Sequence, residues 1–148
     1  MSENAGTPDP VGLERQRWEE ASHGEFDLLA LGDDYATDGV LDTAGYGMGT
    51  FDGREAIRGF LGDWIGSFDD LTMVADEIVG FGNAVVLAVY HQEGRPHGST
   101  NYVRVRSALV SEWVDGQIAR VTIYTEAEID QARAAAERLA KEPGVGGV

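Results

Sequence analysis

Asp42 is the acidic residue whose sequence surroundings best suit acid–base chemistry. It ends the short apolar run VLD, which begins at Val40, and the glycine-rich stretch TAGYGMGT follows it. A carboxylate at the end of a strand, aimed into an apolar cavity, could remove a proton next to a carbonyl group. An aspartate followed by Thr43, Ala44 and Gly45 is also a good turn former, because its side chain can accept backbone N–H bonds. The sequence leaves both interpretations open.

Other kinds of reactive site have little support. The three histidines, His23, His91 and His97, are scattered and lack the four-residue helical spacing of a metal site, and the chain contains no cysteine. The glycine-rich stretch lacks the lysine and Ser/Thr of a P-loop and does not match the dinucleotide fingerprint. We therefore predict no metal and no cofactor, and we interpret this stretch as a flexible pocket rim.

Composition limits the size and the partners of the protein. A chain of 148 residues with 43% hydrophobic content predicts one domain with one core. Acidic residues outnumber basic ones 26 to 11, so the formal charge of −15 disfavours nucleic acid and anionic membranes as partners. The N-terminus lacks a leader pattern and no segment is long enough to span a bilayer, so we expect a cytoplasmic protein.

The chain opens with predicted helices. Asp9 as N-cap and Pro10 in the first turn predict a helix through LERQRWEEASHG, and a second short helix covers EFDLLALGDDY before the brief strand TDGVLDT. Asp52 and Glu55 have capping-box spacing ahead of an apolar stripe, which predicts an amphipathic helix. That stripe consists of Ile57, Phe60, Leu61, Trp64, Ile65 and Phe68. We expect residues 1–10 to be disordered, 11–140 to form the domain, and 141–148 to be flexible.

The second half predicts strands. LTMVADEIVGF, AVVLAVYHQE, NYVRVRSALVSEWV and QIARVTIYT are separated by turn signals, including Asp115 and Gly116, and so predict an antiparallel meander. Thr125 and Glu128 then have capping-box spacing before a C-terminal helix. Together these elements predict an α+β domain in which a curved antiparallel sheet wraps around helices.

Strand alternation predicts which residues face the interior. On the last two strands the expected inward set is mostly apolar, with a few neutral polar groups. It comprises Asn101, Val103, Val105, Ser107, Leu109, Ser111, Trp113, Val121, Ile123 and Thr125. Arg104, Arg106 and Glu112 fall on the opposite face. The run AVVLAVY is apolar at every position, so alternation alone does not orient Tyr90.

The order of elements, together with DGREAIRGFLGDW and EWVDGQIARVTIYTE, resembles the nuclear transport factor two-like superfamily, and in particular its SnoaL-like branch. The resemblance covers about residues 13–140. It implies a cone-shaped sheet wrapped around N-terminal helices, with an apolar pocket between them. Ketosteroid isomerases, polyketide cyclases, scytalone dehydratase and limonene epoxide hydrolase share this fold, so the fold does not decide the reaction.

The resemblance also suggests roles for individual residues. Asp42 resembles the general base of ketosteroid isomerase, whose two oxygen donors correspond to Trp18 and Leu109. An indole can donate one hydrogen bond and leucine none, which weakens the case for isomerase activity. The essential acid of the SnoaL-like cyclases corresponds to Ile123.

Five further expectations rest on the resemblance or on helical spacing. Tyr90 is placed inward, and Tyr35 and Tyr46 near the pocket mouth. Trp64 belongs to an apolar helical stripe and is expected mainly to pack, whereas Trp18 is equally compatible with packing and ligand contact. Members of the superfamily commonly pair through the outer face of the sheet, so the resemblance implies a homodimer.

Two functions remain. The first is a cofactor-free isomerase, cyclase or dehydratase acting on a small hydrophobic carbonyl compound, with Asp42 as base and Trp18, Tyr46 or Asn101 holding the oxygen. The alternative is a non-catalytic module that binds a hydrophobic ligand. Leu109 and Ile123 favour the second, because they leave two strands without the acids that the chemistry requires.

Overall fold

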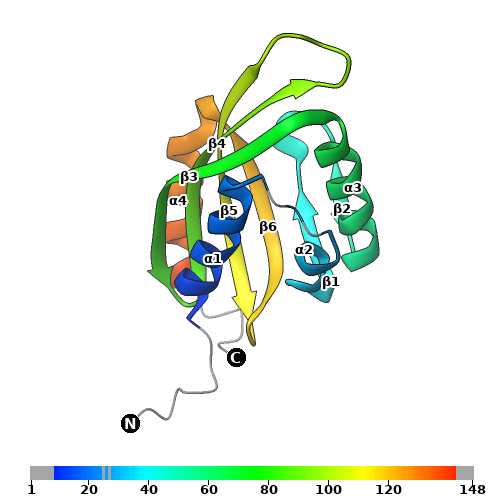
Figure 1. The fold of residues 1–148 in the computed structure, drawn as a ribbon. Helices are drawn as coiled ribbons and strands as arrows, with labels where there is room; N and C mark the ends of the chain where they lie inside the picture. Colours follow the sequence, from blue (N-terminus) through cyan, green and yellow to red (C-terminus); the bar gives the residue numbers. More distant parts are fainter. Residues whose placement is uncertain (1–8, 25, 27, 143–148) are drawn as a thin grey trace.

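The computed structural model describes residues 9–24, 26 and 28–142 (Figure 1). Its elements confirm the predicted α+β class. In chain order they are α1 (Pro10–Ser22), α2 (Leu28–Asp33), β1 (Tyr35–Asp42), the short 3-10 helix η1 (Ala44–Tyr46), β2 (Thr50–Asp52), α3 (Arg54–Gly66), β3 (Phe68–Gly82), β4 (Val85–Pro96), β5 (Val103–Val114), β6 (Gln117–Thr125), the 3-10 helix η2 (Glu126–Glu128) and α4 (Ile129–Lys141). None of the helices in these ranges is long and apolar enough to cross a bilayer.

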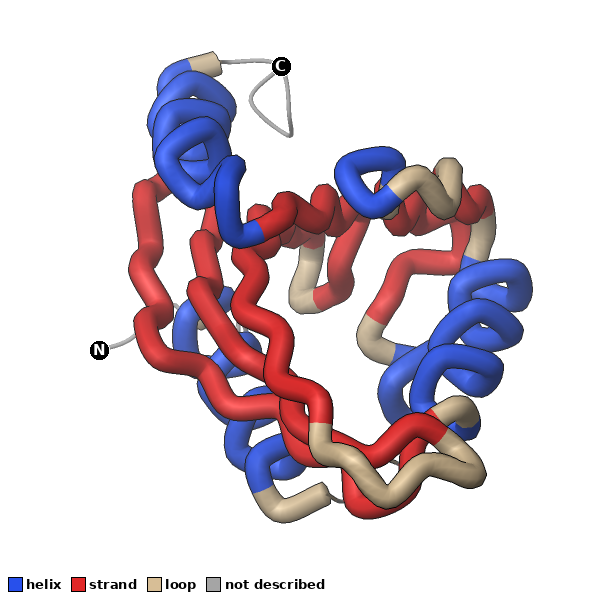
Figure 2. The backbone as a smooth tube through the Cα atoms, turned by 90° about the horizontal axis from the view of Figure 1, so that it is seen from above, coloured by secondary structure: helices blue, strands red, loops and turns tan. Residues whose placement is uncertain are grey.

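All six strands belong to one sheet. Their order is β2-β1-β6-β5-β4-β3, with β1 and β6 parallel and all other neighbours antiparallel. Seen from above, the strands curve around an interior and do not close into a barrel (Figure 2). The four long strands β3 to β6 form the predicted meander, and the parallel contact brings β1 next to the last strand.

The sheet is covered on both faces at the start of β4, which explains why residues 85–90 of this strand are apolar at every position. Val86, Ala88 and Tyr90 belong to the inner core with Trp18 of α1. The alternate residues of β4 pack on the outer face in a second core, which consists of Val85, Leu87, Val89, Ala108, Val110, Ala132 and Ala136. A strand buried on both faces loses its apolar and polar alternation. The small residues Ala132 and Ala136 let α4 approach the sheet closely, and both are fully buried.

Most predicted caps and turns are confirmed. Asp9 accepts a hydrogen bond from the backbone N–H of Val11, and the Thr125–Glu128 capping box is present. At the hairpin between β5 and β6, Asp115 and Gly116 have φ angles of 53° and 80°, which suit a type I′ turn.

The predicted cap at Asp52 is wrong. The N-cap of α3 is Gly53, whose φ of 95° is accessible mainly to glycine, and no side chain caps this helix. Asp52 instead ends β2, where it pairs with Val40. The helix start is held to the sheet by Arg54, whose Nε and Nη2 atoms donate to the Tyr35 carbonyl at 3.0 and 2.7 Å.

A helix lies near each end of the described part of the chain. α1 begins at Pro10, so the last residue of the segment expected to be disordered is helical, and α4 ends at Lys141. Residues 1–8 and 143–148 lie outside the described residues, and the domain limits of 11–140 stay a prediction.

A buried carboxylate joins α1 to the sheet. Glu14 is fully buried, and its Oε2 and Oε1 atoms accept hydrogen bonds from Trp18 Nε1 at 2.8 Å and Ser111 Oγ at 2.9 Å. Ser111 Oγ also accepts from Trp113 Nε1 at 2.9 Å. Because a buried polar group is tolerated only when it is hydrogen-bonded, this network helps to determine where α1 lies against β5.

Replacement of Glu14 should therefore destabilise the protein. We expect Glu14→Ala to lower the free energy of unfolding by about 3 kcal/mol, because it leaves the Trp18 N–H and the Ser111 hydroxyl without their acceptor and opens a small cavity. Urea denaturation measures the change. Glu19→Ala, at an exposed site on the same helix, should stay within about 0.5 kcal/mol of the parent. Equal effects of the two substitutions would contradict this role of Glu14.

Candidate functional site

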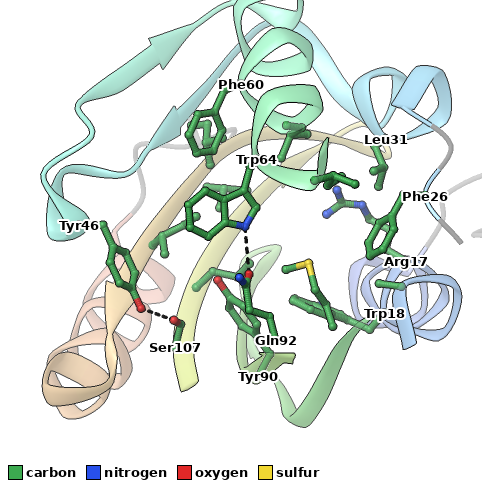
Figure 3. A pocket seen from close by; sticks show the side chains of 18 of the residues that line it. Arg17, Trp18, Phe26, Leu31, Tyr46, Phe60, Trp64, Tyr90, Gln92 and Ser107 are labelled. Carbon is green, nitrogen blue, oxygen red and sulfur yellow. Dashed lines mark hydrogen bonds between the residues drawn. The ribbon is translucent and has the colours of Figure 1, made fainter. Parts of the chain in front are cut away.

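A cavity of about 200 Å³ lies between the inner face of the sheet and the helices α1, α2 and α3 (Figure 3). Its wall is mainly aromatic and aliphatic. Trp18 and Tyr90 form one side, with ring centroids 4.7 Å apart. The other apolar and thioether side chains of the lining are Ala21, Phe26, Leu31, Leu41, Met48, Phe60, Leu61, Trp64, Ile65, Met73, Val105, Leu109, Val121 and Ile123.

One end of the cavity carries a cation and a phenol. Arg17 Nε donates to Asp34 Oδ2 at 2.9 Å, and Arg17 Cζ lies 5.7 Å from the ring centroid of Tyr35. Burial lowers the pKa of Arg17, but Tyr35, Glu14 and Asp34 together raise it by more. Burial also raises the pKa of Tyr35 by more than the Arg17 guanidinium lowers it. At physiological pH this end therefore presents a guanidinium and a neutral hydroxyl.

The other polar groups come from β4, β5 and the rim. Trp64 Nε1 donates to Gln92 Oε1 at 3.0 Å, which orients the Gln92 amide. The hydroxyls of Tyr46 and Ser107 form a close hydrogen bond. Burial raises the pKa of Tyr90, and the neighbouring Tyr46 adds to this effect, so the Tyr90 hydroxyl remains protonated.

Asp42 is turned away from the cavity. Its Oδ1 accepts from the Ala44 backbone N–H at 2.9 Å, and its Oδ2 accepts from Arg120 Nη2 at 3.1 Å. Leu41 and Val121 line the cavity, so their neighbours along the strands, Asp42 and Arg120, point to the opposite face of the sheet. Of the two interpretations of Asp42, the structure shows the turn-forming arrangement.

The glycine-rich stretch forms the expected rim, and its base is firmly closed. Thr43 is fully buried, and its backbone N and Oγ1 both donate to the Gly49 carbonyl, at 2.8 and 2.7 Å. A Cβ at Gly45 would lie 3.0 Å from the Ile123 carbonyl, so the loop packs tightly against β6 at this position. The loop presents Tyr46 and Met48 at the rim, each 37% exposed.

The structure brings together most of the predicted pocket residues. Those that line the cavity are Trp18, Tyr35, Tyr46, Trp64, Tyr90, Leu109 and Ile123. Asp42, Asn101 and Trp113 do not. Asn101 is exposed in the turn before β5, and Trp113 is buried beyond the cavity, where its indole donates to Ser111.

Trp18 combines the two roles between which the sequence did not decide. Its ring lines the cavity, while its N–H donates to Glu14 at 2.8 Å. The indole therefore offers a flat apolar surface to a ligand and has no N–H left to hold an oxygen.

Sequence reasoning missed Arg17 and Gln92. Gln92 follows Tyr90 by two residues on β4 and shares its face, so alternation could have identified it. Arg17 was harder to identify, because arginine usually lies on the surface and nothing in the sequence indicates that this one lines a cavity.

The histidines are paired with surface carboxylates. His91 contacts Asp76 at 3.0 Å and His97 contacts Asp69 at 3.1 Å. Within the described ranges no three His, Cys, Asp or Glu side chains gather to hold a metal ion.

Solved structures with the same fold are numerous, and at the identities found they show the fold alone. A hypothetical protein with a ketosteroid isomerase-like fold from Catenulispora acidiphila, in complex with trimethylamine, is 21% identical with a TM-score of 0.65, over 86% of this chain and 94% of that one. A presumed SnoaL-like polyketide cyclase from Jannaschia sp. CCS1 is 13% identical with a TM-score of 0.67, over 97% and 99%. SalBIII, an epoxide hydrolase/cyclase-like enzyme of salinomycin pyran ring formation, is 14% identical with a TM-score of 0.66, over 78% and 89%.

At the level of sequence, no protein with curated annotation matches the chain. Comparison of the sequence with protein-family models gives a match. Residues 16–121 match the model of the SnoaL-like domain, a range that runs from α1 through the middle of β6 and includes most of the cavity lining. The chain therefore belongs to the SnoaL-like domain family.

Proposed function

We propose that this SnoaL-like protein binds a small, mostly apolar molecule that carries an oxygen acceptor. The observation that carries the proposal is the cavity itself, in which apolar walls surround a few buried hydrogen-bond donors. Such a combination is typical of ligand sites, where the walls supply affinity and the polar groups fix orientation. The family assignment supports a small-molecule ligand.

The cavity volume limits the size of this ligand. An apolar cavity of about 150 Å³ holds benzene, so a cavity of about 200 Å³ suits a single ring with short substituents. Contact with the rings of Trp18, Tyr90 and Phe60 would remove both surfaces of a flat molecule from water.

The donors suit a carbonyl or ether oxygen. Since the Gln92 Oε1 accepts from Trp64, the Gln92 NH₂ group is the part that can donate to a ligand. The Tyr90 hydroxyl is kept protonated by burial and can also donate. A ligand that lacked an acceptor would leave these donors unpaired, which disfavours its binding.

A second candidate function is catalysis by an isomerase or a cyclase, and SalBIII, which has the same fold, is an epoxide hydrolase/cyclase-like enzyme. Catalysis is favoured by the same donors, since groups that bind a carbonyl oxygen also stabilise an enolate. With Asp42 as base, it would require the carboxylate to leave Arg120 and the Ala44 N–H and to reach the other face of β1. We therefore place binding before turnover.

Acetophenone and ethylbenzene, which differ by one carbonyl oxygen, test the binding function. We expect acetophenone to bind more tightly than ethylbenzene, and Gln92→Leu to weaken acetophenone binding about 10-fold without weakening ethylbenzene binding, because only acetophenone loses a hydrogen bond. In ¹H–¹⁵N spectra the indole signals of Trp18 and Trp64 should shift with ligand, and that of Trp113 should not.

Gln117→Leu is the matched control, because Gln117 lies at the start of β6 outside the cavity. It should bind both compounds like the parent. Shifts confined to Trp113, or equal losses in the two leucine variants, would count against the cavity as the binding site.

Asp42→Asn separates the two candidate functions. Asparagine keeps the acceptor for the Ala44 N–H and loses only the ion pair with the half-exposed Arg120, so stability should fall by less than about 1 kcal/mol. We expect unchanged acetophenone binding and equal rates of deuterium exchange at its methyl group, followed by NMR in D₂O. Faster exchange with the parent than with Asp42→Asn would replace the binding function by the isomerase-like one.

A further inference from the structure

Arg17 is the one charged side chain that lines the cavity, within the part of the chain that the structure describes. Its side chain is only 17% exposed. In Figure 3 it lies among Phe26, Leu31 and Trp18, on the opposite side of the cavity from the Tyr46–Ser107 pair. A cation in such surroundings is costly unless an anion or several acceptors compensate it.

The buried Glu14 carboxyl helps to raise the pKa of Arg17, but Arg17 itself donates few hydrogen bonds to the protein. Its Nε atom donates to Asp34, whose side chain is 39% exposed and so is shared with solvent. The two terminal nitrogens, Nη1 and Nη2, donate to no carboxylate or carbonyl of the described residues. A guanidinium has five N–H groups, and the four on its terminal nitrogens are the ones that match the two oxygens of a carboxylate.

We propose that the Arg17 end of the cavity binds a carboxylate, so that the natural ligand is a small apolar carboxylic acid in its ionised form. This inference rests on the proposed function and names its ligand class. The neutral hydroxyl of Tyr35 lies beside the guanidinium and offers a further donor to the same group. The ring of the ligand lies against Trp18 and Tyr90, and its far side reaches Gln92.

The surroundings favour a carboxylate over a larger anion. A single guanidinium balances one negative charge, whereas a phosphate carries more charge and would meet no second cation in the described lining. The net charge of −15 also disfavours multiply charged anions. Arg17 is only 17% exposed among apolar side chains, and surroundings of low polarity strengthen a hydrogen bond between two charged groups.

Benzoate and benzamide test the inference, because they have the same shape and differ in charge. At pH 7.5 and low salt we expect the protein to bind benzoate at least about 10-fold more tightly than benzamide, measured by calorimetry and by the Trp18 and Trp64 indole shifts. Arg17→Gln should weaken benzoate binding about 30-fold and abolish the preference. Arg15→Gln, the same charge change at an exposed site of α1, should keep it.

Asp34→Asn provides a test that keeps Arg17 in place. Removal of the competing negative charge should raise the affinity for benzoate several-fold and leave benzamide unchanged, because asparagine can still accept from Arg17 Nε but no longer neutralises the guanidinium. This variant also tests the carboxylate site if Arg17→Gln does not fold. An unchanged or reduced preference for benzoate in Asp34→Asn would overturn the inference.

The outcomes separate this inference from the proposed function. Equal affinities for benzoate and benzamide, or a preference that survives in Arg17→Gln, would overturn the carboxylate site while acetophenone binding continued to support a ligand cavity. If benzoate, benzamide and acetophenone all failed to bind, the proposed function itself would fall, and the carboxylate site with it.

Discussion

The position of helix α1 depends on one buried carboxylate. Glu14 accepts hydrogen bonds from Trp18 within the helix and from Ser111 on β5, and without them burial of its polar carboxyl group would be costly. These hydrogen bonds fix the orientation of α1 relative to the sheet, and this orientation brings Trp18 and Arg17 to the cavity wall. The Trp18 ring and the Arg17 guanidinium thus reach the cavity for the same reason, namely the hydrogen bonds that fix α1 against the sheet.

The second organising constraint is that the sheet is buried on both sides. β4 contributes Tyr90 and Gln92 to the inner face, while Leu87 and Val89 of the same strand pack outward under α4. The same strand therefore contributes to both the cavity and the outer core. Packing in the outer core supports the backbone that carries the hydrogen-bond donors Tyr90 and Gln92. An open cavity can persist on one side of the sheet because close packing on the other side supports it.

Much of the fold could be predicted from the sequence, because it rests on local signals. The Asp9 cap, the Thr125–Glu128 box and the Asp115–Gly116 turn each act within a few residues. The site was only partly predictable. Alternation located Ser107, Leu109 and Ile123 correctly. Alternation failed where tertiary contacts decide which way a side chain points, as at Arg17. It also failed where both faces of a strand are apolar, as in residues 85–90 of β4. Asp42 shows the same limit, since its partner Arg120 lies 78 residues away in the chain.

Helix α4 also affects how copies of this protein could associate. By lying over β4 and β5 it takes up the apolar centre of the convex side of the sheet for the chain's own core. Beyond the helix that side presents Arg104 beside Glu93 and Arg106 beside Asp76, all partly or fully accessible. Self-association through this surface would have to exchange one set of ion pairs for another, and its strength would then follow the ionic strength of the solution more than any gain in buried apolar area.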